Sequence, residues 1–303
     1  MIIAVFPGQG SQSPGFLTPW LALDGAADRV AAYSEWAGVD LTAAGTEWDA
    51  EQIRDTQVAQ PLIVAASLLS WNALTDRDRI AGVAGHSVGE LAAAAAAGIL
   101  SEEDALRLVG IRGRAMADAA AVEQTGMSAV IGGDEAAVVA RLAELDLTPA
   151  NYNGGGQVVA AGALDALQSL SAEPPAGTRV IPLQVAGAFH TRYMAPAVEA
   201  LRAAAADVAA SDPSVAIWSN RDGARVDSGA AFVDLLVDQV ASPVRWDLCM
   251  SSFADQGITG LIELAPAGTL TGLAKRALRG VPAVAVKTPD ELPAAAALTG
   301  DSA

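Results

Sequence analysis

Residues 85–90 read Gly-His-Ser-Val-Gly-Glu and place Ser87 at the spacing of a nucleophile elbow. The pattern G-x-S-x-G suits a sharp turn between a strand and a helix. Small residues two positions before and after the serine let the two backbone segments approach each other closely. Such a turn exposes the serine hydroxyl at the positive end of a helix and leaves the amide of Val88 where an oxyanion would form. A chance match is the alternative, since glycine and serine are common residues.

A serine nucleophile needs a base, and the chain has only two histidines, His86 and His190. The side chains of adjacent residues in such a turn diverge, whereas a base must approach the serine oxygen within about 3 Å. We therefore predict that His86 supports the turn structurally. His190 lies in a predicted loop after a strand, which is a usual place for a catalytic residue. We predict that His190 is the general base.

The hydrophobic pattern predicts that Ser87 lies between a buried strand and an alanine-rich helix. Glycine, proline and capping residues bound the other elements, and Ser101 is a good N-cap for the following helix. The predicted strands are Ile2–Phe6, Ile80–Ala84, Val215–Ser219 and Ile258–Glu263. The predicted helices are residues 88–97, 101–120, 194–210, 230–240 and 270–278.

Between residues 123 and 189 the pattern changes to β-α-β-β-α-β, which is typical of a ferredoxin-like unit. The glycines at 154–156 fit a hairpin turn better than a phosphate cradle, because no helix follows them. We predict a small inserted domain over 123–189, with a larger domain formed by 1–122 and 190–303. The predicted elements of the small domain are 127–132, 134–145, 147–151, 157–161, 164–170 and 179–185.

Arg112 lies on the apolar stripe of the predicted helix. Its neighbours three and four residues away are Leu108, Val109, Ala115 and Met116. An arginine on a stripe that faces the core needs an anionic partner or a cleft. Its planar fork fits a carboxylate bidentately, and an internal acid is the alternative partner.

The composition excludes several kinds of partner and site. The net charge of −17 argues against a nucleic-acid or anionic-membrane partner. One cysteine, Cys249, rules out an internal disulfide, and the two histidines leave little for a metal site. We expect no metal and no cofactor. The first residues lack a basic segment, and the apolar stretch Leu91–Leu100 is too short to span a bilayer, so we expect a cytoplasmic protein.

Together, these segments resemble the malonyl-CoA:acyl-carrier-protein transacylases of fatty-acid synthesis and the acyltransferase domains of polyketide synthases. The matching pieces occur in family order over nearly the whole chain. They are residues 7–12 (PGQGSQ), 85–90 (GHSVGE), Arg112, 151–153 (NYN), 157–159 (QVV), 188–190 (AFH), 242–246 (SPVRW), 264–268 (LAPAG) and 270–273 (LTGL). The resemblance implies an α/β fold, in which an α/β-hydrolase-like large domain with a parallel sheet carries the inserted ferredoxin-like domain.

The resemblance also implies a mechanism. Ser87 would attack the malonyl thioester, His190 would take its proton, and the phosphopantetheine thiol of acyl carrier protein would then accept the malonyl group. The backbone amides of Gln9 and Val88 would form the oxyanion hole. Arg112 would bind the free carboxylate of the malonyl group.

Further residues take supporting roles by the same resemblance. A backbone carbonyl within Ser242–Trp246 would orient the base, and Asn153 and Arg245 would support the site. Arg245 stands where many members have glutamine, which puts a side-chain role there in doubt. Phe189 resembles the malonyl-selective polyketide branch, and its ring could crowd an α-methyl group. Core packing is the alternative for Phe189.

Docking of an acidic carrier protein on this acidic chain requires a local basic patch. Lys275, Arg276 and Arg279 form the densest basic cluster, and a solvated helix face is the alternative. We expect malonyl-CoA and acyl carrier protein as partners, and a monomer. A trans-acting polyketide acyltransferase for another dicarboxylic extender unit, a serine esterase and a non-catalytic scaffold remain alternatives.

Overall fold

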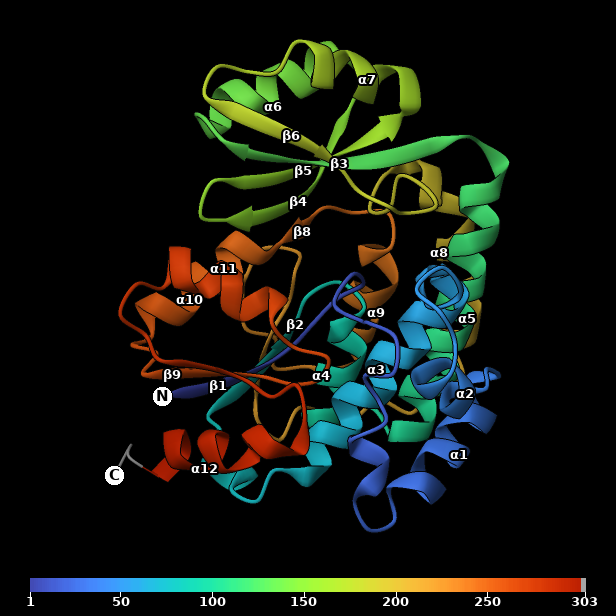
Figure 1. Ribbon diagram of the computed structural model, residues 1–303, viewed down its shortest axis with the longest axis vertical. Helices are drawn as coiled ribbons and strands as arrows, with labels where there is room; N and C mark the ends of the chain where they lie inside the picture. Colours follow the sequence, from blue (N-terminus) through green and yellow to red (C-terminus); the bar gives the residue numbers. More distant parts are fainter. Residues whose placement is uncertain (301–303) are drawn as a thin grey trace.

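The computed structural model describes residues 1–300, and they form two five-stranded sheets, of which the first is entirely parallel (Figure 1). Its strand order is β10-β9-β1-β2-β7. The strands are β1 (Ile2–Phe6), β2 (Gly82–Gly85), β7 (Ala216–Trp218), β9 (Gly260–Glu263) and β10 (Ala283–Ala285). The four strands predicted from apolar runs lie here within two residues of their predicted bounds, and only β10 was not predicted.

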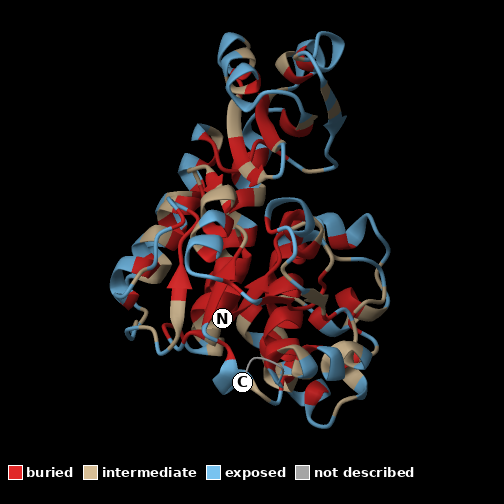
Figure 2. Ribbon diagram, turned by 90° about the vertical axis from the view of Figure 1, so that its left-hand side faces the viewer, coloured by how far each residue is buried: buried red, intermediate tan, exposed pale blue. Residues whose placement is uncertain are grey.

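Helices cover both faces of this sheet because its strands are apolar on both faces. In β1 the side chains of Ile2, Ala4 and Phe6 join one core, while those of Ile3 and Val5 join another. The burial of these cores is visible in Figure 2. The helices are α1 (Ala26–Ala37), α2 (Leu41–Thr46), α3 (Thr56–Ala73), α4 (Gly89–Ala96), α5 (Glu102–Val122), α8 (Ala195–Ala205), α9 (Gly229–Gln239), α10 (Trp246–Asp255), α11 (Thr269–Ala277) and α12 (Leu292–Gly300).

The long helix α5 begins where its cap predicts. The hydroxyl of Ser101 accepts a hydrogen bond from the amide of Asp104 at 3.0 Å, and acidic residues fill the first turn. The helix crosses the molecule from this end to the second sheet (Figure 1). Arg112 lies near its middle, on the buried side.

The second sheet has the order β6-β3-β5-β4-β8, and two helices cover its outer face (Figure 1). Its first four strands and two helices follow the predicted β-α-β-β-α-β order. Positive φ angles at Gly154, Gly155 and Gly156 make the turn between β4 and β5, as predicted. The elements are β3 (Thr125–Gly132), α6 (Glu135–Glu144), β4 (Thr148–Gly154), β5 (Gln157–Ala163), α7 (Leu164–Ala172) and β6 (Thr178–Pro182).

The fifth strand of this sheet comes from a distant part of the chain. Strand β8 (Val244–Arg245) pairs in parallel with Asn151 and Tyr152 of β4. Helices α10 and α11 also contact β4, so they lie between the two sheets (Figure 1). The segment 123–189 therefore does not build its sheet alone, and the domain boundaries drawn from the sequence stay a prediction.

Candidate active site

Ser87 occupies a tight turn between β2 and α4. Its φ is +53°, in the left-handed region that is unfavourable for residues with a side chain. A Cβ at Gly85 would lie 2.0 Å from the carbonyl carbon of Gly89, and a Cβ at Gly89 would lie 2.2 Å from the Phe6 oxygen. Only glycine fits at both positions, which is the physical reason for the G-x-S-x-G pattern.

The turn directs the Ser87 hydroxyl at His190. Ser87 Oγ lies 2.7 Å from His190 Nε2, although 103 positions separate the two residues in the chain. The His190 backbone also adopts a positive φ, +62°, and the residue is buried. The structure thus brings together the two residues that the sequence predicts as nucleophile and base.

The backbone carbonyl nearest the other ring nitrogen of His190 lies just before the segment expected. The acceptor is the carbonyl of Gln239, 2.8 Å from His190 Nδ1, whereas the sequence predicted a carbonyl within Ser242–Trp246. Gln239 is the last residue of α9, and the carbonyls of a helix's last turn lack partners within the helix. The backbone of Ser242, inside the predicted segment, also hydrogen-bonds to His190 and acts to raise its pKa, so the prediction missed only the main acceptor. Any residue can supply a carbonyl, so residue type carries no signal for it.

This contact decides which nitrogen of His190 is free. When Nδ1 donates to the Gln239 carbonyl, Nε2 presents its lone pair to the Ser87 hydroxyl. Burial, and next the positive charge of Arg112, lower the pKa of His190 to about 3. The imidazole is therefore neutral near pH 7 and can accept a proton.

The His86 ring has partners other than the Ser87 hydroxyl, as its adjacency to the nucleophile predicts. Its Nε2 is 2.9 Å from Asn153 Oδ1, and its ring meets the edge of Trp246 at 5.7 Å between centroids. Burial lowers the pKa of His86, which keeps this ring neutral too. Asn153 in turn donates to Gln157 Oε1 at 3.1 Å. The predicted supporting residue Asn153 thus connects the second sheet to the turn of the nucleophile.

Two backbone amides line the space beside Ser87. Among residues 1–300, neither the amide of Gln9 nor that of Val88 has an acceptor. The Gln9 side chain points away, toward the carbonyl of Arg54 and the hydroxyl of Thr56, both at 3.4 Å. Two N–H groups that line the cavity without a protein acceptor are free to donate, and two such donors beside a nucleophile are what an oxyanion hole requires.

Arg112 completes the group around Ser87. Its Nη2 lies 3.4 Å from Ser87 Oγ, and the residue is only 2% exposed. Its two direct partners are amide oxygens: Gln60 Oε1 at 2.6 Å and Gln239 Oε1 at 2.9 Å. Burial lowers the pKa of Arg112 to about 10, against the opposing effect of the Glu90 charge. No acid contacts the guanidinium within the described chain, so the alternative of an internal ion pair does not hold.

Ser87, His190, Gln9 and Val88 line a cavity of about 280 Å³ that lies between the two sheets, while Arg112 lies behind this lining, in contact with Ser87 and Gln60. Backbone of the β1 loop and the start of α11 form one wall, and β3, β4 and β5 form the other. Phe189, the predicted selectivity residue, packs into the wall beside His190 and is 5% exposed. Other apolar lining residues are Met116, Met127, Ala129, Val159, Leu183, Leu270 and Leu273.

Comparison with known proteins identifies the family of the chain. A family model described as the acyl transferase domain matches residues 3–292. The malonyl CoA-acyl carrier protein transacylase of Mycobacterium tuberculosis (strain H37Rv) is 55% identical over 296 residues, which cover 96% of this chain and 98% of that protein. The chain belongs to the malonyl-CoA:acyl-carrier-protein transacylase family. The family predicted from the sequence is confirmed.

Solved structures of this family share the fold. The crystal structure of the transacylase from Mycobacterium tuberculosis matches with a TM-score of 0.93 at 55% identity, over 96% of this chain and 98% of that one. A malonyl-transacylase solved in complex with a type II polyketide acyl-carrier protein matches with a TM-score of 0.89 at 31% identity, over 97% and 98%. The predicted α/β fold with a parallel sheet and a small second domain is confirmed.

Four polar residues of the site were not predicted from the sequence to belong to it. They are Gln60, Glu90, Asn220 and Gln239, and all are buried. Gln239 lies on a predicted helix, among apolar residues, and a lone amide in such a run is a usable signal. Gln60 directly precedes Pro61 and lies outside the predicted helices. Glu90 belongs to the quoted motif itself. Nothing in the sequence marks Asn220, which follows a short strand.

Arg245 does not reach the catalytic pair. Its guanidinium binds Asp247 through two contacts, at 3.0 and 2.7 Å, and stacks over Tyr152 at 4.5 Å from the ring centroid. Arg245 therefore supports the junction between β8 and β4 and does not line the cavity. The expectation that it supports the site holds only indirectly, through this junction.

The predicted docking cluster lies at the far end of α11. Lys275, Arg276 and Arg279 are exposed, and none forms an ion pair with another residue of the described chain. The opposite end of the same helix, at Thr269 and Leu270, lines the cavity. One helix thus connects the cavity wall to an unneutralised basic surface.

Within residues 1–300 no helix is both long and apolar enough to cross a membrane. The same part of the chain holds no group of three or more histidine, cysteine, aspartate or glutamate residues arranged to bind a metal ion.

Proposed function

We propose that the chain transfers a malonyl group from malonyl-CoA to the phosphopantetheine thiol of acyl carrier protein, through a malonyl-serine intermediate. One observation carries the proposal: a base and a cation both lie beside a single hydroxyl oxygen. Ser87 Oγ has a neutral imidazole at 2.7 Å and a guanidinium at 3.4 Å. A nucleophile, its base and a cation for the substrate's carboxylate therefore meet at one point.

In the first half-reaction Ser87 Oγ attacks the thioester carbonyl carbon while its proton passes to His190 Nε2. The negative oxygen of the tetrahedral intermediate accepts hydrogen bonds from the amides of Val88 and Gln9. The carbon–sulfur bond then breaks, and the CoA sulfur takes the proton from His190. This leaves a malonyl ester on Ser87 and a neutral His190.

The second half-reaction reverses these steps with a new thiol. The phosphopantetheine thiol gives its proton to His190, and its sulfur attacks the ester carbon. The carbon–oxygen bond to Ser87 breaks, and Ser87 Oγ recovers the proton from His190. Because protein groups supply every proton and every charge stabilisation, we propose that neither a metal nor a cofactor takes part.

Substrate choice follows from charge and shape. Arg112 is buried with only neutral amide partners, so its charge is available to a carboxylate within reach of Ser87. An acetyl group offers nothing to this cation. Phe189 lies in the cavity wall beside His190, where its ring would crowd an α-methyl substituent.

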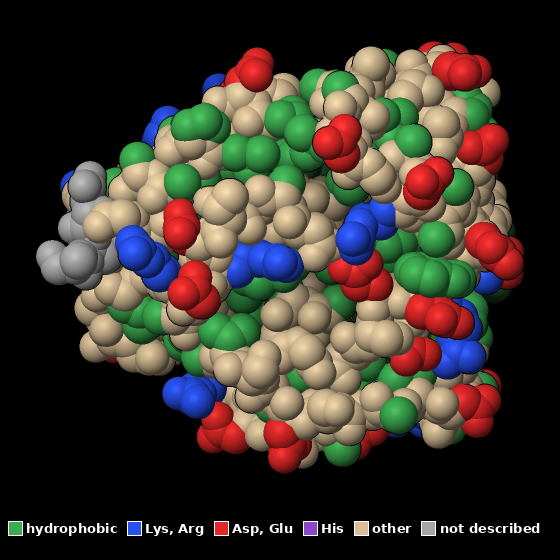
Figure 3. Space-filling view, turned by 90° about the horizontal axis from the view of Figure 1, so that it is seen from below, with side chains coloured by type: hydrophobic (Ala, Val, Ile, Leu, Met, Phe, Trp, Pro, Cys, Tyr) green, Lys and Arg blue, Asp and Glu red, His purple; other side chains and the backbone are tan. Residues whose placement is uncertain are grey.

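For the carrier protein, we propose that the exposed cations Lys275, Arg276 and Arg279 supply the docking surface. On the face seen from below in Figure 3, lysine and arginine side chains lie interspersed with acidic ones, so that face offers no comparable patch. A polyketide carrier protein is a second candidate acceptor, favoured by the related malonyl-transacylase solved with one. A monomeric state and a cytoplasmic location remain predictions from the sequence.

Intact-mass measurement after incubation with malonyl-, methylmalonyl- and acetyl-CoA tests the proposal. We expect a malonyl adduct on the wild-type chain, loss of the adduct in Ser87→Ala, and discharge of the adduct by holo acyl carrier protein. Ester hydrolysis without an adduct from any acyl-CoA would contradict the proposal and favour a serine esterase.

A further inference from the structure

A buried carboxylate that the chemistry above does not use lies three residues after the nucleophile. Glu90, in the first turn of α4, is 1% exposed. Its Oε1 accepts from the backbone amide of Asn220 at 2.6 Å, and its Oε2 accepts from Nε2 of Gln239. Burial raises the pKa of Glu90, while these two hydrogen bonds and the charge of Arg112 act in the opposite direction and stabilise the ionised form. Both oxygens are acceptors here, which is the arrangement of a carboxylate.

The first partner of Glu90 holds the strained turn from below. Asn220 Oδ1 accepts from the Ser87 amide at 2.7 Å, and Asn220 Nδ2 donates to the Gly85 carbonyl at 2.7 Å. One side chain thus pairs with backbone groups on both sides of His86, across the tightest part of the turn. The hydrogen bond that the Asn220 backbone amide donates to Glu90 places this side chain.

The second partner of Glu90 contacts the other groups of the site. Gln239 Nε2 donates to Glu90 and to the Ser87 carbonyl at 3.1 Å, and Gln239 Oε1 accepts from Arg112. The backbone carbonyl of the same residue holds His190. Glu90 accepts only, so it requires the NH₂ end of the Gln239 amide, and the oxygen end is left for the guanidinium.

We propose that Glu90 is a positioning residue for acyl transfer, which fixes the amide orientation of Gln239 and the place of Asn220, and through them the Ser87 turn and Arg112. The inference rests on the proposed function only for the identity of the acyl group. Glu90 touches neither the hydroxyl nor the cavity, so its effect passes entirely through its two partners.

The isosteric change Glu90→Gln tests the orientation directly. A glutamine at 90 keeps one acceptor and turns the other into a donor, which then faces either the Asn220 amide or the NH₂ of Gln239. Rotation of the Gln239 amide would relieve that contact, but it would direct the NH₂ group at Arg112 instead. No arrangement satisfies all the partners, although the volume of the side chain is unchanged.

The experiment measures the rate at which a fluorophosphonate phosphonylates Ser87, alongside the thermal midpoint of each variant. This probe forms an oxygen–phosphorus bond as fluoride leaves and the serine proton passes to His190, so it reports on the nucleophile without a malonyl group. The matched control is Glu102→Gln, which changes a carboxylate in another hydrogen-bonded network, away from the cavity. If the fluorophosphonate labels the wild-type chain but no malonyl adduct forms, that result contradicts the proposed function and leaves the inference about Glu90 standing.

We expect labelling to slow at least tenfold in Glu90→Gln and to stay within twofold of wild type in Glu102→Gln. A folded Glu90→Gln chain that labels within twofold of wild type would overturn the proposal, and so would an equal slowing in Glu102→Gln. If Glu90→Gln does not fold, Asn220→Ala decides. It removes the acceptor of the Ser87 amide, so slow labelling supports the proposal and labelling within twofold of wild type overturns it.

Discussion

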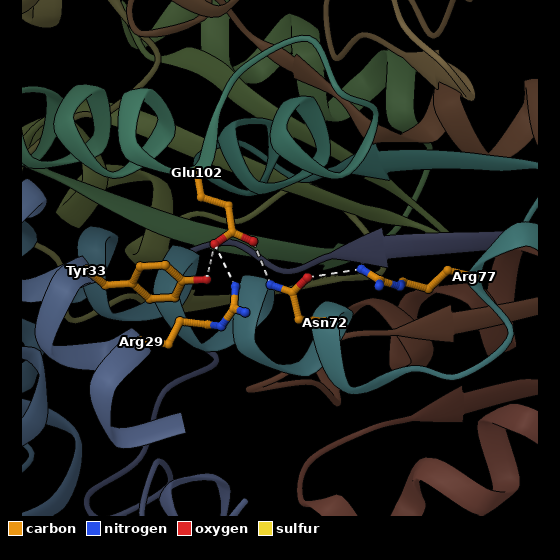
Figure 4. A network of polar contacts seen from close by, with 5 residues as sticks. All are labelled: Arg29, Tyr33, Asn72, Arg77 and Glu102. Atoms are coloured by element: carbon orange, nitrogen blue, oxygen red, sulfur yellow. Dashed lines mark hydrogen bonds and ion pairs between the residues drawn. The ribbon is translucent and has the colours of Figure 1, made fainter. Parts of the chain in front are cut away.

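Two carboxylates, Glu90 and Glu102, organise polar networks that differ in burial and in what they hold. Glu102 Oε2 accepts from Tyr33 at 2.6 Å and from Arg29 at 3.0 Å, while its Oε1 accepts from Asn72 at 2.6 Å (Figure 4). Arg77 extends this network by donating to Asn72. The Glu102 network therefore fastens α1 and α3 to the first turn of α5.

The difference lies in the access of water. The Glu102 side chain is 28% exposed, and that of Arg29 is 44% exposed, so water can replace a lost partner. Glu90 is buried away from water, so the loss of one of its partners leaves a buried polar group without a hydrogen bond. The exposed network is suited to stabilising the fold, while the buried one can hold an otherwise unfavourable geometry such as the Ser87 turn.

The largest expected effect concerns the arginine of the buried network. Arg112→Ala should lower malonyl transfer about 10²- to 10³-fold, because it removes a buried cation that pairs with the substrate's carboxylate. Acetyl transfer should fall much less. The measurement is the rate of adduct formation with each acyl-CoA. Arg29→Ala is the control from the Glu102 network and should leave both rates unchanged. Equal losses for malonyl and acetyl groups would remove the role assigned to Arg112.

The next effect should appear in stability alone. Glu102→Ala removes a charged acceptor from Tyr33, Arg29 and Asn72, and we expect the free energy of unfolding to fall by about 2–3 kcal/mol. Urea unfolding monitored by circular dichroism gives this value. The rate of malonyl transfer at 25 °C should stay at the wild-type level, and a lower rate would erase the distinction between the two networks.

The pH dependence of the free energy of unfolding should further distinguish the buried groups around Ser87 from the Glu102 network. The pKa of His190 is about 3 in the folded chain, against an ordinary value of 6.5, so the unfolded chain binds more protons between these values. His190 therefore contributes stability that is fully present above pH 6.5 and is lost as the pH falls toward 3. The expected slope is up to about 1.4 kcal/mol per pH unit.

Unfolding measured between pH 6 and pH 4.5 checks this slope by comparing wild type with His190→Gln, which should lack this contribution. Ser87→Ala retains the imidazole and should follow the wild-type slope. Equal slopes for wild type and His190→Gln would show that the histidine is not held neutral in the folded chain.

The smallest effect belongs to the rim of the Glu102 network. Arg77 is exposed and donates one hydrogen bond to Asn72 at 3.0 Å, so Arg77→Ala should change the free energy of unfolding by less than about 1 kcal/mol. Urea unfolding at low and high salt gives this value. A loss of 2 kcal/mol or more would mean that Arg77 belongs to the structural part of the network.

The sequence alone determined the features that depend on near neighbours. The glycines around Ser87 encode the turn, because a Cβ at either position would collide with backbone. Apolar runs and capping residues predicted four of the five parallel strands and the start of α5. Helical period placed Arg112 on the buried side. The scarcity of histidine left His190 as the base, and the distance of 2.7 Å to Ser87 agrees with that choice.

Only the tertiary structure decided which distant groups meet. It assigned the carbonyl that holds His190 to Gln239, showed that Arg245 pairs with Asp247, and brought β8 into the second sheet. It also joined Glu90 to partners 130 and 149 positions away. The physical reason is that turns and periodicities express local geometry, while amides, carboxylates and carbonyls accept many partners, so packing of the whole chain selects among them.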